Sequence, residues 1–397
     1  MSETNPEALL RLLTTGGASQ PRRQLLETHD TPHAALEAGP RAWRSAGLDE
    51  AQIRALDTPP PEAVAEHRRA LDWLSGPSHH LIGWHDPDYP ALLRRITNPP
   101  LALFVAGDPG LLWHPMVAVV GSRSPSAGGR DNAYDFSRAL ATSGLGIASG
   151  LAAGIDTAAH EAALDANAIT VAVLGSGIDV PYPRENTALH ARIAAAGAVI
   201  SEHAPGTAAR REHFPSRNRI IAGLALGTLV VEAAERSGAL ITARLTTEAG
   251  RDVFAVPGSI HNPMARGCHR LIRDGAGLVE SASEVITAIA PLAVELGEAL
   301  RGRLSAPMTR AGNDQKTTIS SPAADPRLDD PDYNRLWEAL GHDPTGMDRL
   351  VERTGLTAAE LSSMLLLMEL EGRVIAKHGR YSRKSCHDAS TDAGRGK

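Results

Sequence analysis

Apolar positions divide the chain into regions with different patterns. Within residues 1–78, leucines together with Trp43 recur at roughly helical spacing, and glycine-containing turns interrupt them. This spacing predicts a small, all-helical N-terminal domain. One segment, TTGGASQPRR, is a loose match to a helix-hairpin-helix, whose glycine turn presents backbone N–H groups to phosphate. Two interpretations stay open: a SAM-like packing or interaction module, or a helix-hairpin-helix that contacts DNA.

Residues 79–290 have a different texture. Short β-rich runs alternate with Ala-rich helical stretches about every 25 to 30 residues, which is typical of βα units. The runs are apolar without strict alternation, as expected for strands that are covered on both faces. The pattern predicts an α/β domain with an extended Rossmann-like, doubly wound parallel sheet. Its predicted strands are MVAVV (116–120), LGIAS (145–149), TVAVL (170–174), AVIS (198–201), TLVV (228–231) and DVFAV (252–256).

The C-terminal part begins with a loss of periodicity. Residues 291–330 are polar and punctuated by proline, which predicts a linker. Residues 331–383 then contain two helical runs, YNRLWEAL and MDRLVERT, and a third helix from Thr357 with Glu360 completing a capping box. A hairpin pattern follows around His378-Gly379. This order predicts a winged helix, followed by a disordered tail at 384–397.

Composition restricts the class of protein. Of 397 residues, 42% are hydrophobic and 22% are charged, as in ordinary globular proteins. The N-terminus lacks the pattern of a signal peptide, and no apolar window reaches the length of a membrane span. Cys268 and Cys386 lie far apart without metal-ligand neighbours, which argues against a disulfide scaffold or zinc module. We expect a cytoplasmic protein without membrane contact, metal or cofactor.

The net charge of −6, from 40 basic and 46 acidic side chains, argues weakly against a nucleic-acid binder. Any binding to phosphate would therefore depend on a local basic cluster. In a parallel sheet such a cluster is expected after the strands, because ligands bind at their carboxyl ends.

The first predicted strand is followed by Gly121, Ser122 and Arg123. Glycine permits close approach of the backbone, serine offers a hydroxyl, and arginine can clamp a phosphate. A helix that begins near Ser126 would direct its free N–H groups to the same place. A tight turn with a surface arginine is the alternative. The loop is not GxGxxG, so a dinucleotide cofactor is not expected.

The next two loops are also rich in glycine. Ser149 and Gly150 open a run that reaches Asp156, with His160 one helical turn further on, and Gly175 opens GSGID. Asp156 and His160 form either an acid–base pair or a structural pair at a helix start, and we favour the structural interpretation.

The densest signal is the segment 210–219, with four arginines around one phenylalanine. A phosphate tract beside a ring for base stacking is what a single strand of nucleic acid requires. The alternative is that Arg217 and Arg219 cap or cross-link the scaffold. We expect Arg211 and Phe214 to contact the ligand and Arg217 and Asn218 to be partly structural. The candidate contacts are Gly121, Ser122, Arg123, Ser149, Gly150, Gly175, Arg210, Arg211, Phe214, Arg217, Asn218 and Arg219.

Glu232 ends the fifth predicted strand, and Ser237-Gly238 leads into a helix that carries Thr242. A carboxylate in this place can orient a ribose, attack a glycosidic bond, or hold neighbouring arginines. Six residues are therefore candidates for supporting the site: Asp156, His160, Glu232, Ser237, Gly238 and Thr242. No Ser-His-Asp triad, Walker loop or metal cluster is visible.

Read in order, seven blocks resemble the DNA-processing protein A (DprA/Smf) family: VAVVGSR, SGLAAGIDTAAHEAAL, TVAVLGSGIDVPYPRENTAL, SEHAPGT, FPSRNRIIAGLALGTLVVEA, SGALITA and GRDVFAVPGS. The resemblance implies a homodimeric, non-enzymatic protein that binds and protects single-stranded DNA during natural transformation and loads the RecA recombinase. It places DNA contacts at Ser122, Arg123, Arg211, Phe214 and the Arg217-Asn218 pair. The rival is a Rossmann-like hydrolase that cleaves the base from a nucleoside monophosphate through Glu232. A transcription regulator is weaker, because TAAELSSMLLLMELEG is acidic and apolar.

Overall fold

The computed structural model describes residues 5–305 and, further along the chain, residues 335–337, 339–340, 345–356, 361, 364–365, 368, 374–377 and 380–383. It consists of two compact units, Met1–Pro307 and Met308–Lys397, which are described separately. Within the described residues, no helix has both the length and the apolar character needed to cross a bilayer.

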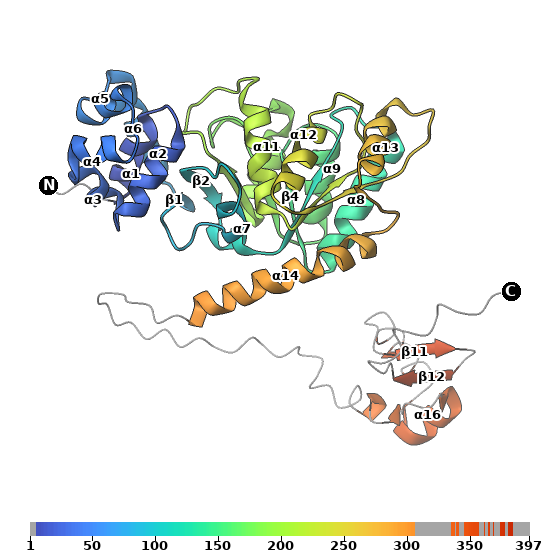
Figure 1. Cartoon of the computed structure of the whole chain (residues 1–397). Helices are drawn as coiled ribbons and strands as arrows, with labels where there is room; N and C mark the ends of the chain where they lie inside the picture. The colour runs from blue at the N-terminus through green and yellow to red at the C-terminus, as the bar shows by residue number, and fades with distance from the viewer. Residues whose placement is uncertain are drawn as a thin grey trace. The chain divides into compact units, whose positions relative to one another are not determined.

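The N-terminal residues form short helices, as their leucine spacing predicts: α1 (Asn5–Thr14), α2 (Ser19–Thr28), α3 (Pro32–Glu37), α4 (Gly39–Ser45), α5 (Glu50–Asp57) and α6 (Pro61–Leu74). Two starts are fixed by local chemistry: Thr31 caps α3, and Asp49 with Gln52 forms a capping box on α5. The helices share a leucine core that includes Trp43 and packs against Leu101 and Ala102. They gather at one end of the sheet (Figure 1).

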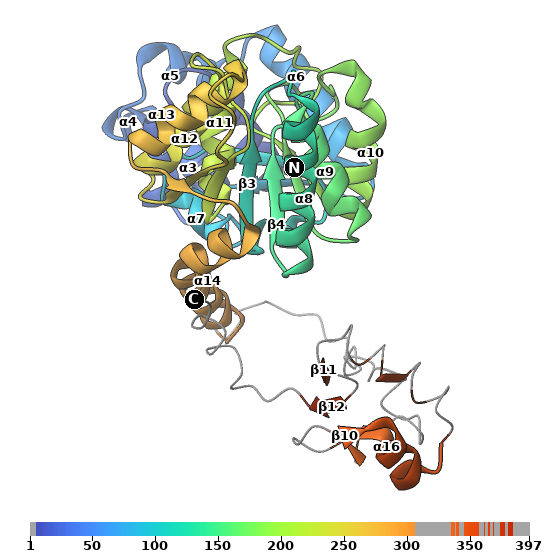
Figure 2. The same cartoon turned by 90° about the vertical axis from the view of Figure 1, so that its right-hand side faces the viewer.

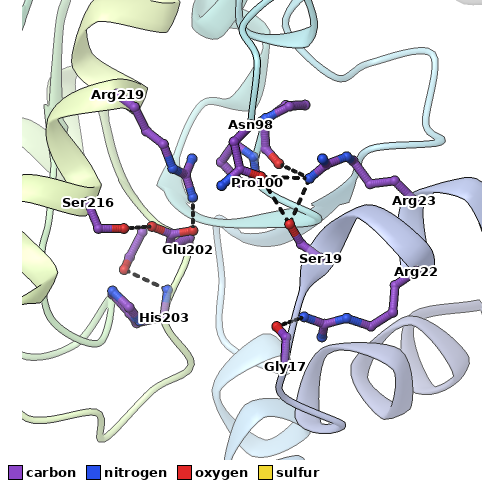
Figure 3. A network of polar contacts seen from close by, with 12 residues as sticks. Gly17, Ser19, Arg22, Arg23, Asn98, Pro100, Glu202, His203, Ser216 and Arg219 are labelled. Atoms are coloured by element: carbon purple, nitrogen blue, oxygen red, sulfur yellow. Dashed lines mark hydrogen bonds and ion pairs between the residues drawn. The ribbon is translucent and has the colours of Figure 1, made fainter. Parts of the chain in front are cut away.

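The hairpin-like segment is held by internal contacts. The Arg22 guanidinium is buried and donates to the carbonyl oxygens of Leu12 at 2.8 Å and Gly17 at 3.0 Å. Arg23 donates to Ser19 at 2.7 Å and to the Pro99 carbonyl at 2.8 Å (Figure 3). Burial lowers the pKa of Arg22 to about 10. Because both arginines satisfy carbonyl groups inside the protein, the geometry favours a packing module over a phosphate-binding hairpin.

The central sheet has nine strands in the order β1-β2-β6-β5-β4-β3-β7-β8-β9. Their bounds are β1 (His79–Gly83), β2 (Ala102–Gly107), β3 (Met116–Val120), β4 (Gly146–Ser149), β5 (Thr170–Val173), β6 (Ala198–Ser201), β7 (Gly227–Val230), β8 (Asp252–Ala255) and β9 (Gly277–Leu278). All pairs from β6 to β9 are parallel, which confirms the doubly wound core. At one edge the sheet is mixed, because β1 pairs antiparallel with β2 and β2 pairs antiparallel with β6.

Helices cover both faces of this sheet, since alternate strand residues point to opposite sides. On β3, Met116, Ala118 and Val120 face one core, while Val117 and Val119 face the other. The first face is covered by α7 (Ala91–Arg94), α11 (His213–Leu224), α12 (Ala239–Glu248) and α13 (Arg266–Arg273). The second is covered by α8 (Ala127–Thr142), α9 (Ile155–Asp165) and α10 (Thr187–Ala196), as Figure 2 shows. Helix α14 (Ala282–Ser305) packs against the same core. The connections include 3-10 turns at η1 (Pro109–Trp113), η2 (Arg184–Asn186) and η3 (Pro263–Ala265).

Helix α14 corrects the predicted start of the linker. The sequence predicts a linker from residue 291, but the helix continues through Pro291 to Ser305. Its second half is anchored by the buried Leu296 and by an ion pair of 2.7 Å between Glu295 and Arg95. The rest of the predicted linker, 306–330, and the tail, 384–397, lie outside the described residues.

The C-terminal unit has a sheet in the order β10-β12-β11, formed by β10 (Thr345–Gly346), β11 (Val374–Lys377) and β12 (Arg380–Arg383). Helix α16 (Met347–Thr354) packs with its core of leucines, Met368 and Val374. Three strands beside helices agree with the predicted winged helix. The Thr357–Glu360 capping box and the His378-Gly379 turn lie outside the described residues.

Candidate nucleic-acid interface

An open pocket of about 750 Å³ lies at the carboxyl ends of the central strands. Its walls come from the loops after β3 and β7, together with α11 and the start of α12. Strand β3 is where the chain order reverses, because β4 lies on one side of it and β7 on the other. Ligands of open α/β sheets bind at such a point. Predicted residues that line the pocket are Gly121, Ser122, Arg123, Asp156, Arg211, Phe214, Arg217, Asn218, Ser237, Gly238 and Thr242.

Phe214 provides a half-exposed ring at one side of this pocket. The Tyr182 ring lies 5.3 Å from it, centroid to centroid, at 46°. The Arg123 guanidinium carbon lies 5.4 Å from the Phe214 centroid, within cation–π range. Phe214 thus combines a hydrophobic surface for a base with a nearby positive charge.

Three arginines line the pocket, are exposed and form no ion pair with any described residue: Arg123, Arg211 and Arg236. Their charges are therefore available to an anionic ligand. Arg217 and Arg219 are engaged within the protein. The three free arginines form a local basic cluster despite the net acidic composition.

Arg217 is one of the engaged arginines. Its side chain is buried, and Nη1 donates to the carbonyl of Gly150 at 2.6 Å and to that of Val173. Burial lowers its pKa to about 10, a value at which it is still charged at neutral pH. Burial also raises the pKa of Asp156. The positive charge of Arg217 and the hydrogen bonds from the backbone N–H groups of Gly150 and Ala152 counteract part of this rise. Arg217 thus joins the ends of β4 and β5, in line with its partly structural expected role.

Two glycines proposed as DNA contacts instead make room for side chains. A Cβ on Gly150 would lie 2.6 Å from the Arg217 guanidinium, and one on Gly175 would lie 3.0 Å from Phe214. Ser149, predicted to contact DNA, is wholly buried and donates to the Val119 carbonyl at 2.6 Å. These three residues build the floor beneath the pocket and do not line it.

Arg210 and Arg219 also lie outside the pocket lining. Arg210 is exposed just before α11. Arg219 forms an ion pair with Glu202, which also accepts a hydrogen bond from Ser216 at 3.4 Å (Figure 3). The cross-linking interpretation therefore holds for Arg219. Asn218 faces the pocket and donates to the Gly238 carbonyl at 3.4 Å, linking α11 to α12.

Glu232 closes the start of α8. Its carboxylate accepts from the backbone N–H of Ser126 at 2.9 Å, from the Ser126 hydroxyl at 2.6 Å and from Asn262 at 2.9 Å. Ser126 in turn caps the helix at Gly129. The expectation that this helix start faces a phosphate is wrong, because a carboxylate already occupies it. Glu232 is buried and outside the pocket lining, and its carboxylate is engaged in holding the start of α8.

His160 is a core residue. It is fully buried, and its Nδ1 lies 2.7 Å from the hydroxyl of Thr170, which donates to the Ile147 carbonyl. Its partner is therefore Thr170, and the structural interpretation of Asp156 and His160 holds. Burial, together with a smaller effect of the positive charge of Arg217, lowers the pKa of His160 to about 3.

This histidine predicts a pH dependence of stability. Between about pH 3 and 6.5 the unfolded chain protonates His160 while the folded protein does not, so stability falls as the pH is lowered through this window. His160→Gln, which keeps a polar group opposite Thr170 but does not titrate, is expected to flatten the dependence of Tm on pH between 4 and 6.5. Equal slopes for both proteins in thermal scans would contradict the assignment.

Tyr182 and Arg236 line the pocket but are not among the candidate contacts. Tyr182 follows the GSGID loop, and Arg236 follows Glu232. Both residues lie in loops that follow strands, where ligands of a parallel sheet bind. For Arg236, the sequence feature that indicates the site is a basic residue soon after β7, the strand beside β3. In the described part of the chain, no group of three or more His, Cys, Asp or Glu side chains is arranged to hold a metal ion.

Comparison with known proteins places this geometry in a family. Residues 80–290 match the model described as DNA recombination-mediator protein A, and residues 320–380 match the DprA winged helix domain. Protein Smf of Escherichia coli is 40% identical over 330 residues, covering 81% of this chain and 83% of that protein. The DNA processing protein DprA of Streptococcus pneumoniae is 49% identical over 201 residues, covering 51% of this chain and 71% of that protein.

The X-ray structure of the Streptococcus pneumoniae protein superposes with a TM-score of 0.64 at 37% identity, covering 72% of this chain and 98% of that one. The fold therefore agrees as well as the sequence, and the resemblance drawn from the seven ordered blocks is confirmed. The chain belongs to the DprA/Smf family, the DNA recombination-mediator protein A family.

Proposed function

We propose that the protein binds single-stranded DNA in the pocket at the ends of β3 and β7. The observation that carries this proposal is the convergence of Arg123, Arg211 and Arg236, all without ion pairs in the described structure, with the Phe214 ring. Guanidinium groups suit phosphates, and a ring suits an unstacked base. The descriptions of the matched family and relatives as DNA-processing or recombination-mediator proteins support it.

The ring favours a single strand over a duplex, because duplex bases are already stacked on each other. We therefore expect a gel-shift series to show clear preference for an oligothymidylate over duplex of the same length. Equal affinity for the two would contradict the proposal.

Three phosphate contacts give an expected salt dependence. With about −0.7 per contact, the log–log slope should be close to about −2, a loss of roughly 20-fold between 50 and 200 mM salt. Arg123→Ala and Arg211→Ala are each expected to weaken binding and to reduce the slope by about 0.7. Arg138→Ala is a matched control, because Arg138 is exposed on α8 and does not line the pocket. Fluorescence anisotropy at several salt concentrations measures both quantities, and unchanged slopes would contradict phosphate contact.

We further propose that the protein acts in the cytoplasm as a homodimer that protects the strand and passes it to RecA in transformation or recombination. Its membership in a recombination-mediator family supports this role. The test is RecA filament assembly on strands coated with single-strand-binding protein. Filaments should form faster with the wild type and not with Phe214→Ala.

We propose binding without turnover. The buried contacts of Glu232 with Ser126 and Asn262 support this proposal. Incubation with nucleoside monophosphates should release no base. Release of base that Glu232→Gln abolishes would overturn this part of the proposal.

A further inference from the structure

Tyr182 is an exposed aromatic residue of the pocket that the proposed function does not use. Its side chain is 45% exposed and lines the pocket together with Phe214. An isolated exposed ring needs no explanation, but this one lies beside the ring that is proposed to stack on a base. Tyrosine combines a large apolar face with a polar tip, and it is common where a protein binds a partner. The position of Tyr182 therefore makes it a candidate contact.

The loop that carries Tyr182, between β5 and η2, is fixed to the rest of the domain. Ile178 in this loop is 1% exposed, and the Gly177 N–H donates to a backbone carbonyl of the loop after β6 at 2.8 Å. At the far end the Asn186 side chain donates to the Leu151 carbonyl at 2.9 Å. Because the loop is held at both ends, it presents the Tyr182 ring from a firm support. Binding to such a ring costs little conformational entropy.

The rings of Tyr182 and Phe214 meet at an angle. Their centroids lie 5.3 Å apart, and their planes are inclined by 46°. Because stacked bases are about 3.4 Å apart, a base held between two rings would need them about 7 Å apart. Each of these partly exposed rings can therefore receive a base only on its own, and two bases bound in this way are tilted relative to each other. Neighbouring bases of a duplex are parallel, so only a strand whose bases can separate fits both rings.

We propose that Tyr182 is a second base-stacking ring, so that the pocket receives two successive bases, tilted apart, on Tyr182 and Phe214. This inference rests on the proposed function and adds a sequence preference to it. Adenine bases stack strongly on one another, and that stacking must be broken before two neighbours can tilt apart. Thymine bases stack weakly, so a thymidine run loses less stacking when it binds. Thymidine runs should therefore bind more tightly than adenosine runs.

The first test compares two tyrosines of the full-length protein by fluorescence anisotropy with fluorescein-labelled dT20 and dA20. The wild type should prefer dT20. Tyr182→Ala should bind dT20 about tenfold more weakly, within the range for loss of one base stack. It should bind dA20 almost as the wild type does, because stacked adenines do not fill both rings. Tyr134→Ala is the matched control, since Tyr134 lies on α8 outside the pocket lining, and its affinities should be unchanged.

Two further measurements show that the effect belongs to the ring. Tyr182→Phe keeps the ring and should bind both strands as the wild type does. Tyr182→Ala removes no charge and changes a side chain that is 45% exposed, so its salt slope and Tm should equal those of the wild type. A change in the slope would indicate a phosphate contact, and the second stacking ring would be overturned.

A dT20 strand with every second base removed tests whether the two bases are successive. It keeps the phosphates but never has bases on neighbouring nucleotides, so it cannot fill both rings. The wild type should bind it about as weakly as Tyr182→Ala binds dT20, and Tyr182→Ala should bind the two strands with nearly equal affinity. A loss of the same size on both strands would show that Tyr182 acts by positioning Phe214, and the second stacking ring would be overturned.

The outcomes separate the two proposals. If the wild type binds dT20 and Phe214→Ala weakens this binding, but Tyr182→Ala binds dT20 normally, the second ring is overturned and the proposed function stands. If the wild type binds dA20 as tightly as dT20, the tilted arrangement of two bases is overturned, and the stack on Phe214 stands. If the wild type does not bind dT20, both proposals are overturned.

Discussion

Replacing Arg217 by alanine is expected to destabilise the central domain by about 3–5 kcal/mol, the range found when one partner of a buried charge pair is removed. The change leaves the carbonyls of Gly150 and Val173 without this donor. It also removes the positive charge that favours the ionised form of the buried Asp156 carboxylate. It also opens a space beside Gly150, against which the guanidinium packs. Thermal or chemical unfolding of the full-length protein measures the effect.

Arg217→Lys serves as the control for charge. Lysine keeps the positive charge but has no planar fork, so it should recover only part of the lost stability. If Arg217→Ala unfolds like the wild type and loses only DNA binding, Arg217 is a ligand contact and its structural role is wrong. Arg211→Ala provides the contrasting case, since that exposed arginine should affect binding without affecting stability.

Much of the sheet followed from sequence because its buried strands are short, apolar and regularly spaced. All six predicted strands overlap β3 to β8. The three that were missed lie toward the edges. β1 contains two histidines and β9 has two residues, so neither has the apolar run of a central strand. β2 is wholly buried and apolar, but it lies before the regular βα repeat and pairs antiparallel with β6.

The arginines of segment 210–219 show where sequence reasoning about the site was limited. Composition predicts a basic cluster, but it does not say which guanidinium groups are free. Helical spacing carries part of the answer, since Phe214, Arg217 and Asn218 lie at i, i+3 and i+4 and share the pocket side of α11. Arg219, five residues after Phe214, lies on another side and binds Glu202. The carbonyl partners of Arg217 come from β4 and β5, and such distant contacts were not visible in the local sequence.

The glycines show a related limit. A glycine after a strand permits approach of a ligand or of a side chain, and the sequence does not distinguish the two. At Gly150 and Gly175 the approaching groups are Arg217 and Phe214. At Gly238 an added Cβ would meet no atom within 4 Å, and this residue lines the pocket. The same residue type therefore supports the scaffold in two loops and lines the pocket in a third.

Phe214 is the residue on which the binding proposal depends most. Phe214→Ala is expected to weaken binding of single-stranded DNA by about 1–3 kcal/mol, the range for loss of one base stack. This corresponds to roughly 5- to 140-fold in Kd. Because no charge is removed, the salt slope should be unchanged, in contrast to Arg123→Ala and Arg211→Ala. Phe214→Tyr should bind nearly as well as the wild type, since it keeps the ring.

An oligonucleotide with abasic sites separates base stacking from other effects of the ring. Phe214 also packs near Arg123 and Tyr182, so its loss alters the shape of the pocket as well as removing the stack. If stacking dominates, wild type and Phe214→Ala should bind a fully abasic strand with equal affinity, and the difference between them should appear only with bases present. A loss of the same size on the abasic strand would show that Phe214 acts by positioning Arg123, and the base-stacking role would be wrong.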